Sequence, residues 1–306
     1  MSSLEHVSTG VNIFFSPSVD KIWAMNDING RFFDCAMPHD PDTDPSIIID
    51  PAATGSGTGE SMFDALLMHF AGKETTDELD PRVVKALRAE FERSEFFGDD
   101  MRRLWAMCER VVVQSGRVPG GTGSVINLLN LACGYCEEGA VLSAFWGRSG
   151  KRVRQFAMDL RHAEIDKARR RYAATERMFE AAAGGKIRRR DEGLDVEFIA
   201  DDATHLVGYG EIPENYDVVF IRHQNLWHDR TTWQRIYEFA LARIADNGLL
   251  LITSYFDREH LLALELLKSL GGEILVSERN RSSRELSYPG KSVDRHVAAI
   301  ARGQSS

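Results

Sequence analysis

Cysteine, long apolar runs and net positive charge are scarce in this chain, and each scarcity argues against a class of protein. Four cysteines in 306 residues are too few for a disulfide framework, so a reducing, cytoplasmic environment is expected. No stretch approaches the roughly 18–20 apolar residues of a membrane span. The first ten residues, MSSLEHVSTG, lack the basic and apolar regions of a secretory signal. We therefore expect no membrane partner.

The charge balance argues against a nucleic-acid partner. The formal net charge is -9, and a phosphate surface repels such a protein. Basic clusters do occur at 167–171 and 186–190, but charge runs of this kind usually form a solvated helix face or loop. A hydrophobic content of 43% and 27% charged residues are ordinary for a globular protein of one large domain or two modest ones.

The first part of the chain, 1–115, is predicted to be a mainly helical region with a long loop near 40–60. Short strands are expected at 11–15 and 31–35, and a Pro-, Gly- and Ser-rich loop at 40–61. Apolar residues at helical spacing then predict helices at 60–72, 81–97 and 99–116. Asp80 followed by Pro81 is typical of a helix start.

The second part, 116–306, alternates between apolar runs and amphipathic stretches. This alternation predicts an α/β fold with a doubly wound, mostly parallel sheet that is covered on both faces. Ligands of such sheets bind at the carboxyl ends of the strands. The expected strands are 125–131, 153–160, 195–200, 216–221, 249–254, 274–277 and 296–301, and the expected helices are 137–146, 164–184, 231–248 and 258–272.

The sequence Cys133-Gly134-Tyr135-Cys136 invites a redox or zinc interpretation. A thioredoxin-type dithiol needs a facing proline, and none occurs between Pro119 and Pro213. A zinc site of this type needs a second cysteine pair, which is absent. The segment is best interpreted as the turn after the first strand of the sheet, with a structural cysteine pair.

That turn carries a family resemblance. The segment LLNLACGYC at 128–136 resembles the first motif of class I S-adenosylmethionine-dependent methyltransferases, an apolar strand with an acidic residue and a turn like L-G-C-G-x-G. The matching positions are Leu131, Cys133 and Gly134; Asn130 replaces the acid, and Ala132 and Cys136 replace glycines.

Later segments extend the resemblance over about 125–302 and imply a seven-stranded Rossmann-like sheet that binds S-adenosylmethionine. Asp159, in the segment FAMDL, would accept hydrogen bonds from the ribose hydroxyls; capping of the next helix is the less favoured alternative. Asp202 would accept from the adenine amino group, with Asp201 as the competing acid. The full cofactor-binding set is Asn130, Ala132, Cys133, Gly134, Asp159, Leu160, Asp202, Ala203 and Arg222.

The end of the fourth strand supplies the catalytic candidates. His223 and His228 are potential general bases, since histidine titrates near neutral pH; each could instead be an ordinary packed or surface histidine. We expect the N-terminal helices to cover the carboxyl edge of the sheet. The aromatic residues expected to line the acceptor pocket are Trp23, Phe32, Phe33 and Trp105.

The leading hypothesis is a methyltransferase that acts on oxygen or nitrogen of a small-molecule acceptor, without a metal and with a homodimer as the candidate assembly. The altered first motif leaves open a cofactor-binding scaffold that has lost the transfer reaction. A different transfer from the same cofactor is a weaker possibility. A nicotinamide oxidoreductase would need G-x-G-x-x-G, and the turn has one glycine between Leu131 and Glu138.

Overall fold

The computed structural model of the chain describes residues 58–71, 80–92, 97–120, 123–182, 196–203, 212–224, 226–227 and 229–303. Contacts divide the chain into two units, Met1–Ile49 and Asp50–Ser306, and all described residues belong to the second. The expected strands at 11–15 and 31–35, most of the predicted loop, and Trp23, Phe32, Phe33 and His228 lie outside the described residues. The proposed domain boundary at 115/116 stays a prediction.

Three helices precede the sheet, as the spacing of apolar residues predicts. They are α1 (Thr58–Ala71), α2 (Pro81–Glu92) and α3 (Phe97–Ser115). Asp80 caps α2, because its Oδ1 accepts a hydrogen bond from the backbone N–H of Arg82 at 2.8 Å. Within the described ranges, no helix is long and apolar enough to cross a membrane.

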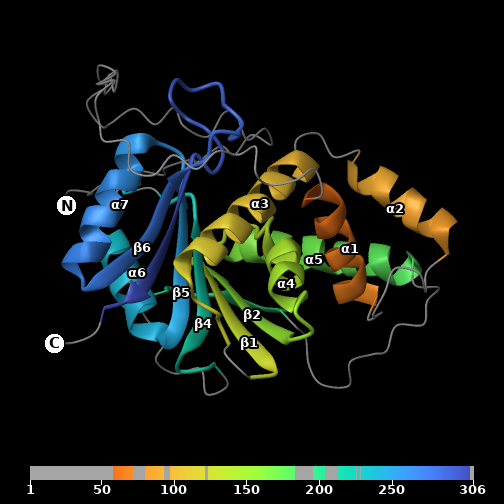
Figure 1. Cartoon of the computed structure of the whole chain (residues 1–306), viewed down its shortest axis with the longest axis horizontal. Coiled ribbons are helices and arrows are strands. Elements are labelled where there is room, and N and C mark those ends of the chain that lie inside the picture. Colours follow the sequence, from red (N-terminus) through yellow and green to blue (C-terminus); the bar gives the residue numbers. More distant parts are fainter. Residues whose placement is uncertain are drawn as a thin grey trace, which may run out of the picture. The chain divides into compact units, whose positions relative to one another are not determined.

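The seven strands form one sheet in the order β3-β2-β1-β4-β5-β7-β6, drawn in Figure 1. All neighbouring pairs from β3 to β5 are parallel, and β7 is antiparallel to both β5 and β6. The predicted doubly wound, mostly parallel sheet is therefore confirmed. The strands are β1 (Val125–Leu131), β2 (Arg152–Asp159), β3 (Val196–Ala200), β4 (Tyr216–Arg222), β5 (Ile244–Ser254), β6 (Gly272–Arg279) and β7 (His296–Arg302).

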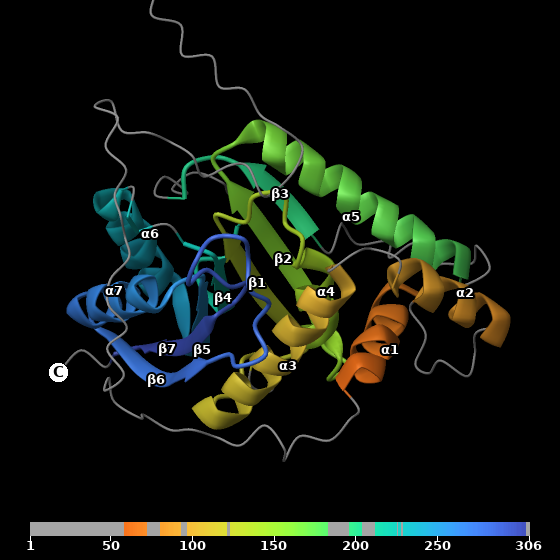
Figure 2. The same ribbon diagram turned by 90° about the horizontal axis from the view of Figure 1, so that it is seen from above.

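Helices cover both faces of the sheet, because alternate strand residues point in opposite directions. Leu128 belongs to the buried cluster under α1, α3, α4 and α5, whereas its neighbour Leu129 belongs to the cluster under α6 and α7. Figure 2 shows α3 and α4 on one side of the sheet and α6 and α7 on the other. The helices within and after the alternating part are α4 (Gly139–Gly147), α5 (His162–Ala182), α6 (Arg230–Arg243) and α7 (Asp257–Ser269).

The position expected for the N-terminal helices is wrong for α3. Instead of covering the carboxyl edge, α3 lies on a face of the sheet, where its Arg110 pairs with Glu278 of β6 at 3.0 Å. Trp105 is 1% exposed and meets Phe145 of α4 edge-on, with ring centroids 5.0 Å apart. Trp105 is therefore a core residue and does not line an acceptor pocket.

The predicted helix at 231–248 ends five residues too late. Helix α6 ends at Arg243, and β5 begins at Ile244, which is buried and pairs with Tyr216. The Asn247–Gly248 pair resembles a helix stop, but it lies within the strand. A Cβ on Gly248 would come within 2.9 Å of the carbonyl oxygens of Tyr216 and Asp217, so close packing against β4 explains this glycine.

Candidate functional site

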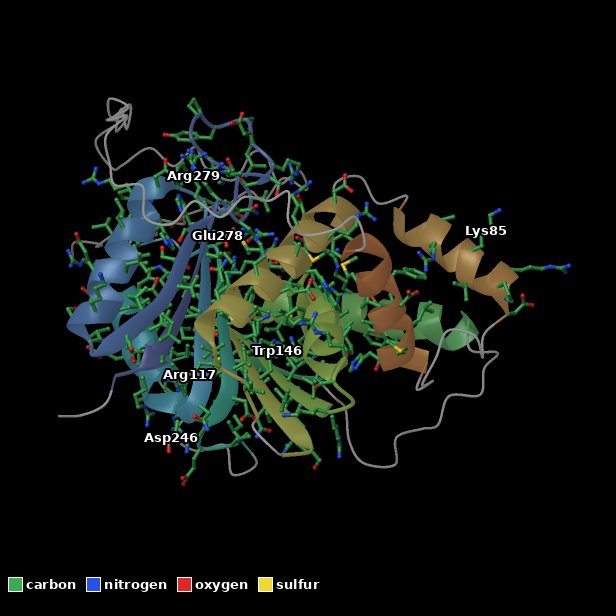
Figure 3. All side chains as sticks on the ribbon, in the orientation of Figure 1. Lys85, Arg117, Trp146, Asp246, Glu278 and Arg279 are labelled. Carbon is green, nitrogen blue, oxygen red and sulfur yellow. The ribbon has the colours of Figure 1, made fainter. Side chains whose placement is uncertain are left out.

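The carboxyl edge of the sheet concentrates unusual backbone conformations. Among the described residues, all four non-glycine residues with positive φ lie here: Ala132, Cys136, His223 and Asp294. Residues with a Cβ rarely adopt such backbone angles, and strained backbone positions cluster at functional sites. In Figure 3, Glu278 and Arg279 mark this edge at the end of β6, and Arg117 and Asp246 lie at the opposite one. We therefore place the candidate site at this edge.

The turn after β1 is tight. Ala132, Gly134 and Cys136 have φ of 53°, 57° and 49°, and the Cys136 N–H donates to the Cys133 carbonyl at 2.8 Å. Both thiols are free. The neighbouring Cys136 thiol and burial raise the pKa of Cys133 well above its ordinary value, so this sulfur stays protonated at neutral pH and is a poor nucleophile.

Asn130 occupies the position where the resemblance has an acid, and a carboxylate lies directly beside it. Its Nδ2 donates to Oε1 of Glu138 at 2.7 Å and to the Cys136 sulfur at 3.5 Å. Both Asn130 and Glu138 are buried. The Oδ1 of Asn130 is buried without a hydrogen-bond partner in the described structure, which leaves an acceptor at the base of the turn.

Asp159 ends β2 and holds the turn after β1. Its Oδ2 accepts from the Gly134 N–H at 2.8 Å, and its Oδ1 accepts from the Arg161 N–H at 2.9 Å. The Arg161 guanidinium adds two further bonds, at 2.9 and 3.1 Å. Burial opposes ionisation, but the bonds and charge of Arg161 together with the Gly134 N–H lower the pKa of Asp159. Asp159 is therefore an ionised, fully bonded carboxylate.

The end of β3 lies next to Asp159, because Asp159 and Ala200 are partners in the parallel ladder. Beyond Ala200, the Asp202 N–H donates to Oδ1 of Asp201 at 2.7 Å, and Ala203 is buried. On the β2 side, Leu160 is 67% exposed. This edge thus combines carboxylates with an exposed apolar side chain, a combination suited to a ring that carries hydroxyl groups.

A buried ionic cluster lies at the end of β4. The Arg222 guanidinium donates to Asp294 through Nε at 3.0 Å and Nη2 at 2.7 Å, while its Nη1 reaches Glu138 at 3.4 Å. Thr253 adds a hydroxyl bond to Asp294 Oδ1 at 2.8 Å. Burial opposes ionisation, but Arg222 and His223 lower the pKa of Asp294 far below its usual range. Arg222, predicted to bind cofactor, is directed into this cluster.

His223 stands at the edge of the same cluster. Its Nε2 lies 2.8 Å from Asp294 Oδ1, and its ring stacks on Tyr255 with centroids 3.9 Å apart. Burial lowers the pKa of His223, although Asp294 opposes the shift, so the imidazole is neutral at pH 7. Its side chain keeps 17% exposure. A neutral, partly accessible imidazole is a reasonable general base.

Aromatic and cationic side chains follow Tyr255, the ring on which His223 stacks. Lys291 Nζ lies 4.3 Å from the Tyr255 ring centroid, and Phe256 meets Tyr288 edge-on at 5.9 Å. Trp227 and Tyr288 are 43% and 47% exposed. Large rings exposed on the segments that follow β4 and β6 are side chains on which a flat organic molecule can stack.

Three residues of this site were missed from the sequence. Glu138 and Arg161 each stand next to a predicted motif, but nothing in their spacing shows that they bond to Asn130 and Asp159. Asp294 lies 71 residues from His223 in sequence, and an isolated acid before the last strand carries no signal. Only the reversed direction of β7, which starts at the carboxyl edge, brings Asp294 to the site.

No group of three or more His, Cys, Asp or Glu side chains that could hold a metal ion occurs among the described residues.

Comparisons with known proteins give structural neighbours only. No family model matches the sequence, and neither does any curated protein. An S-adenosylmethionine-dependent methyltransferase from Clostridium acetobutylicum is 11% identical, covering 66% of this chain and 92% of its own, at a TM-score of 0.42.

Two further solved structures align to a similar extent. An rRNA methylase from Streptococcus thermophilus is 14% identical over 65% of this chain and 96% of its own, with a TM-score of 0.42. The N-methyltransferase NodS from Bradyrhizobium japonicum is 15% identical over 65% and 97%, also at 0.42. At such similarity the functional argument rests on the site itself.

Proposed function

We propose that the chain is an S-adenosylmethionine-dependent methyltransferase that acts on a small-molecule acceptor. The observation that carries the proposal is the presence of carboxylates at two adjacent strand ends, Asp159 at the end of β2 and Asp202 just after β3, with the exposed Leu160 following Asp159. A carboxylate suits a vicinal diol because both its oxygens accept hydrogen bonds. The closing β6–β7 pair is the ending that the resemblance implies.

The described residues fit this cofactor, with one adjustment. Asp159 already accepts bonds from Arg161, so its binding to ribose hydroxyls requires that guanidinium to move. The Arg161 side chain is 61% exposed, whereas that of Asp159 is 6% exposed, so the guanidinium can turn toward solvent while the ribose hydroxyls replace its hydrogen bonds to the buried carboxylate. The Gly134 bond to Asp159 can persist through this exchange.

The residues have distinct roles in the proposed reaction. The sulfonium cofactor supplies an activated methyl group, and the protein must align the acceptor and exclude water. His223 receives the proton of an acceptor hydroxyl or amine, and His228 is a second candidate base. The exposed rings of Trp227 and Tyr288 favour a flat acceptor, and the net charge of -9 opposes a phosphate-rich one.

The alternative of a scaffold that has lost the transfer is favoured by one specific observation. Asn130 and Ala132 replace an acid and a glycine of the first motif. Glu138 offsets the first change, because its carboxylate lies 2.7 Å from the Asn130 amide. Cofactor binding is common to both possibilities, and detection of methyl transfer with a supplied acceptor would separate them.

Calorimetry with S-adenosylhomocysteine, the demethylated cofactor, tests the proposal. We expect Asp159→Ala to weaken binding at least tenfold, which corresponds to roughly 1.4 kcal/mol from lost hydrogen bonds to a charged group. Arg161→Ala should leave binding unchanged or tighten it, since it removes a competitor. The matched control is Asp166→Ala, an exposed acid paired with Arg169 on α5. Wild-type affinity in Asp159→Ala would refute the assignment.

A further inference from the structure

We infer that Asp294 is a positioning residue that holds His223 with its proton on Nε2 and its lone pair on Nδ1. The inference rests on the proposed function only in giving His223 the role of base. The arrangement of the two side chains is a property of the protein alone. Asp294 lies near the end of the β6–β7 connection, just before β7. Nothing in the sequence indicates that this segment lies next to the end of β4.

The contacts of Asp294 fix its carboxylate in place. The residue is 0% exposed, and Arg222 binds it through two parallel N–H donors while Thr253 donates a hydroxyl. These partners leave the carboxylate charged and immobile. A carboxylate held so firmly can orient a side chain that binds to it. The Nε2 atom of His223 lies 2.8 Å from this carboxylate.

Two groups of Asp294 compete for that nitrogen. The carboxylate Oδ1 lies 2.8 Å from Nε2 and can only accept a hydrogen bond. The backbone N–H lies 3.3 Å from Nε2 and can only donate one. The first contact favours a protonated Nε2, and the second favours a protonated Nδ1. The contact to Oδ1 is shorter and involves a charged group, and such bonds are roughly twice as strong as neutral ones. The carboxylate therefore determines the tautomer.

The other ring nitrogen, Nδ1, is the one left to take a proton from an acceptor. Within the described ranges Nδ1 has no hydrogen-bond partner, and the ring is held flat against Tyr255. Both His223 and Asp294 adopt positive φ, 59° and 49°, a conformation that a Cβ disfavours. Strain at both partners of one contact indicates that the surrounding structure maintains this geometry.

A purely structural role for Asp294, as the counter-ion of Arg222, accounts for the guanidinium contacts. It does not account for the strained backbone at His223 or for the placement of a ring nitrogen against the same carboxylate. The two roles make different predictions about the imidazole, since a counter-ion for Arg222 has no reason to select a tautomer.

The tautomer can be measured directly by long-range 1H–15N correlation spectroscopy of the histidine side chains in the full chain at pH 7.5. Comparison with His223→Gln assigns the signals among the nine histidines. We expect wild-type His223 to be neutral with the proton on Nε2. A wild-type proton on Nδ1 would overturn the inference without any variant of Asp294.

The variant Asp294→Gly removes the carboxylate, keeps the backbone N–H and tolerates positive φ. The proton should then move to Nδ1. If this variant does not fold, the wild-type spectrum still decides. The control is Asp257→Asn, because Asp257 makes a similar 2.6 Å contact with His296; it should alter the His296 signals and leave those of His223 unchanged.

An unchanged His223 tautomer in folded Asp294→Gly would refute the inference. These spectra are recorded without cofactor, so their outcome is separate from the calorimetric test of S-adenosylhomocysteine binding. Wild-type affinity in Asp159→Ala together with the expected tautomer would refute the proposed function alone. Weakened binding by Asp159→Ala together with the wrong tautomer would refute the inference alone.

Discussion

At the scale of single residues, the site holds a buried carboxylate at a position other than the one that the family resemblance implies. The acid implied at position 130 is an asparagine, and Glu138 brings a buried carboxylate to 2.7 Å from its amide nitrogen. Glu138 also faces Arg222, which Asp294 neutralises from the other side. Charges that are buried need partners, so these residues have to be interpreted together.

Glu259, in the first turn of α7, is a further buried acid, and its burial predicts a pH-dependent stability. Burial raises its pKa to about 7, above the 4.5 of an exposed glutamate. The folded state therefore binds more protons between these values, and stability falls as the pH rises from about 4.5 through 7. Glu259→Gln should lessen this loss by up to about 3 kcal/mol, as measured by urea unfolding at pH 5 and pH 7.5.

The control for that experiment is Glu265→Gln, which changes an exposed acid on the same helix. Its pH dependence should match the wild type. Parallel curves for Glu259→Gln and the wild type would show that Glu259 ionises normally in the folded protein.

Residue positions next to a recognisable pattern were predictable, and their partners were not. Asp159 and Asp202 follow apolar strands, so their placement at the carboxyl edge could be predicted from chain order. Arg161 and Asp294 bind to acids and bases that only the folded backbone brings near. Hydrogen-bond partners depend on side-chain direction, which no spacing rule contains.

At the scale of elements, an ion pair holds the β6–β7 connection against α3. Arg284, from this connection, binds Asp100 of α3 through Nε at 3.0 Å and Nη2 at 2.7 Å. The connection also has internal order, since the Val293 N–H donates to the Arg284 carbonyl at 2.9 Å. Asp294 lies near the end of this connection. The Arg284–Asp100 ion pair therefore helps to position the Asp294 carboxylate beside His223.

We predict that Asp100→Asn loosens this connection. Loss of a partly buried, charge-assisted pair costs about 1–2 kcal/mol, so the amides of Leu286 and Val293 should exchange hydrogen roughly fivefold to thirtyfold faster. The matched control is Asp99→Asn, since Asp99 is an exposed neighbour that pairs with Arg102 within the same helix. If the two amides exchange equally slowly in Asp100→Asn and the wild type, the Arg284–Asp100 ion pair does not order this connection.

The elements themselves were largely predictable, and the main error is instructive. Alternation of apolar runs and amphipathic stretches gave the strands and helices of the sheet. The segment Ile244–Gly248 was assigned to a helix because Asn-Gly commonly ends one, whereas Ile244 pairs with Tyr216 and Gly248 fits against the β4 backbone. Pairing with a distant strand decides such a segment, and local propensity does not.

At the scale of the whole molecule, the helices before the sheet belong to its core. The residues of α3 that pack under the sheet face are Met101, Leu104, Trp105, Met107, Cys108 and Val111, each exposed by 2% or less. Burial of a large apolar side chain contributes roughly 1.5–3 kcal/mol. Their sum is comparable to the roughly 5–15 kcal/mol that stabilises a whole domain.

We therefore predict opposite outcomes for two truncations. A chain that begins at Gly116 loses α1–α3, leaves one sheet face covered only by α4 and α5, and should be insoluble or unfolded. A chain that begins at Asp50 keeps the second unit intact and should unfold cooperatively near the wild-type midpoint, as measured by circular dichroism during heating. A soluble, cooperatively folded chain from Gly116 would show that these helices form an appendage. Failure of the Asp50 chain to fold would show that Met1–Ile49 is required by the rest of the molecule.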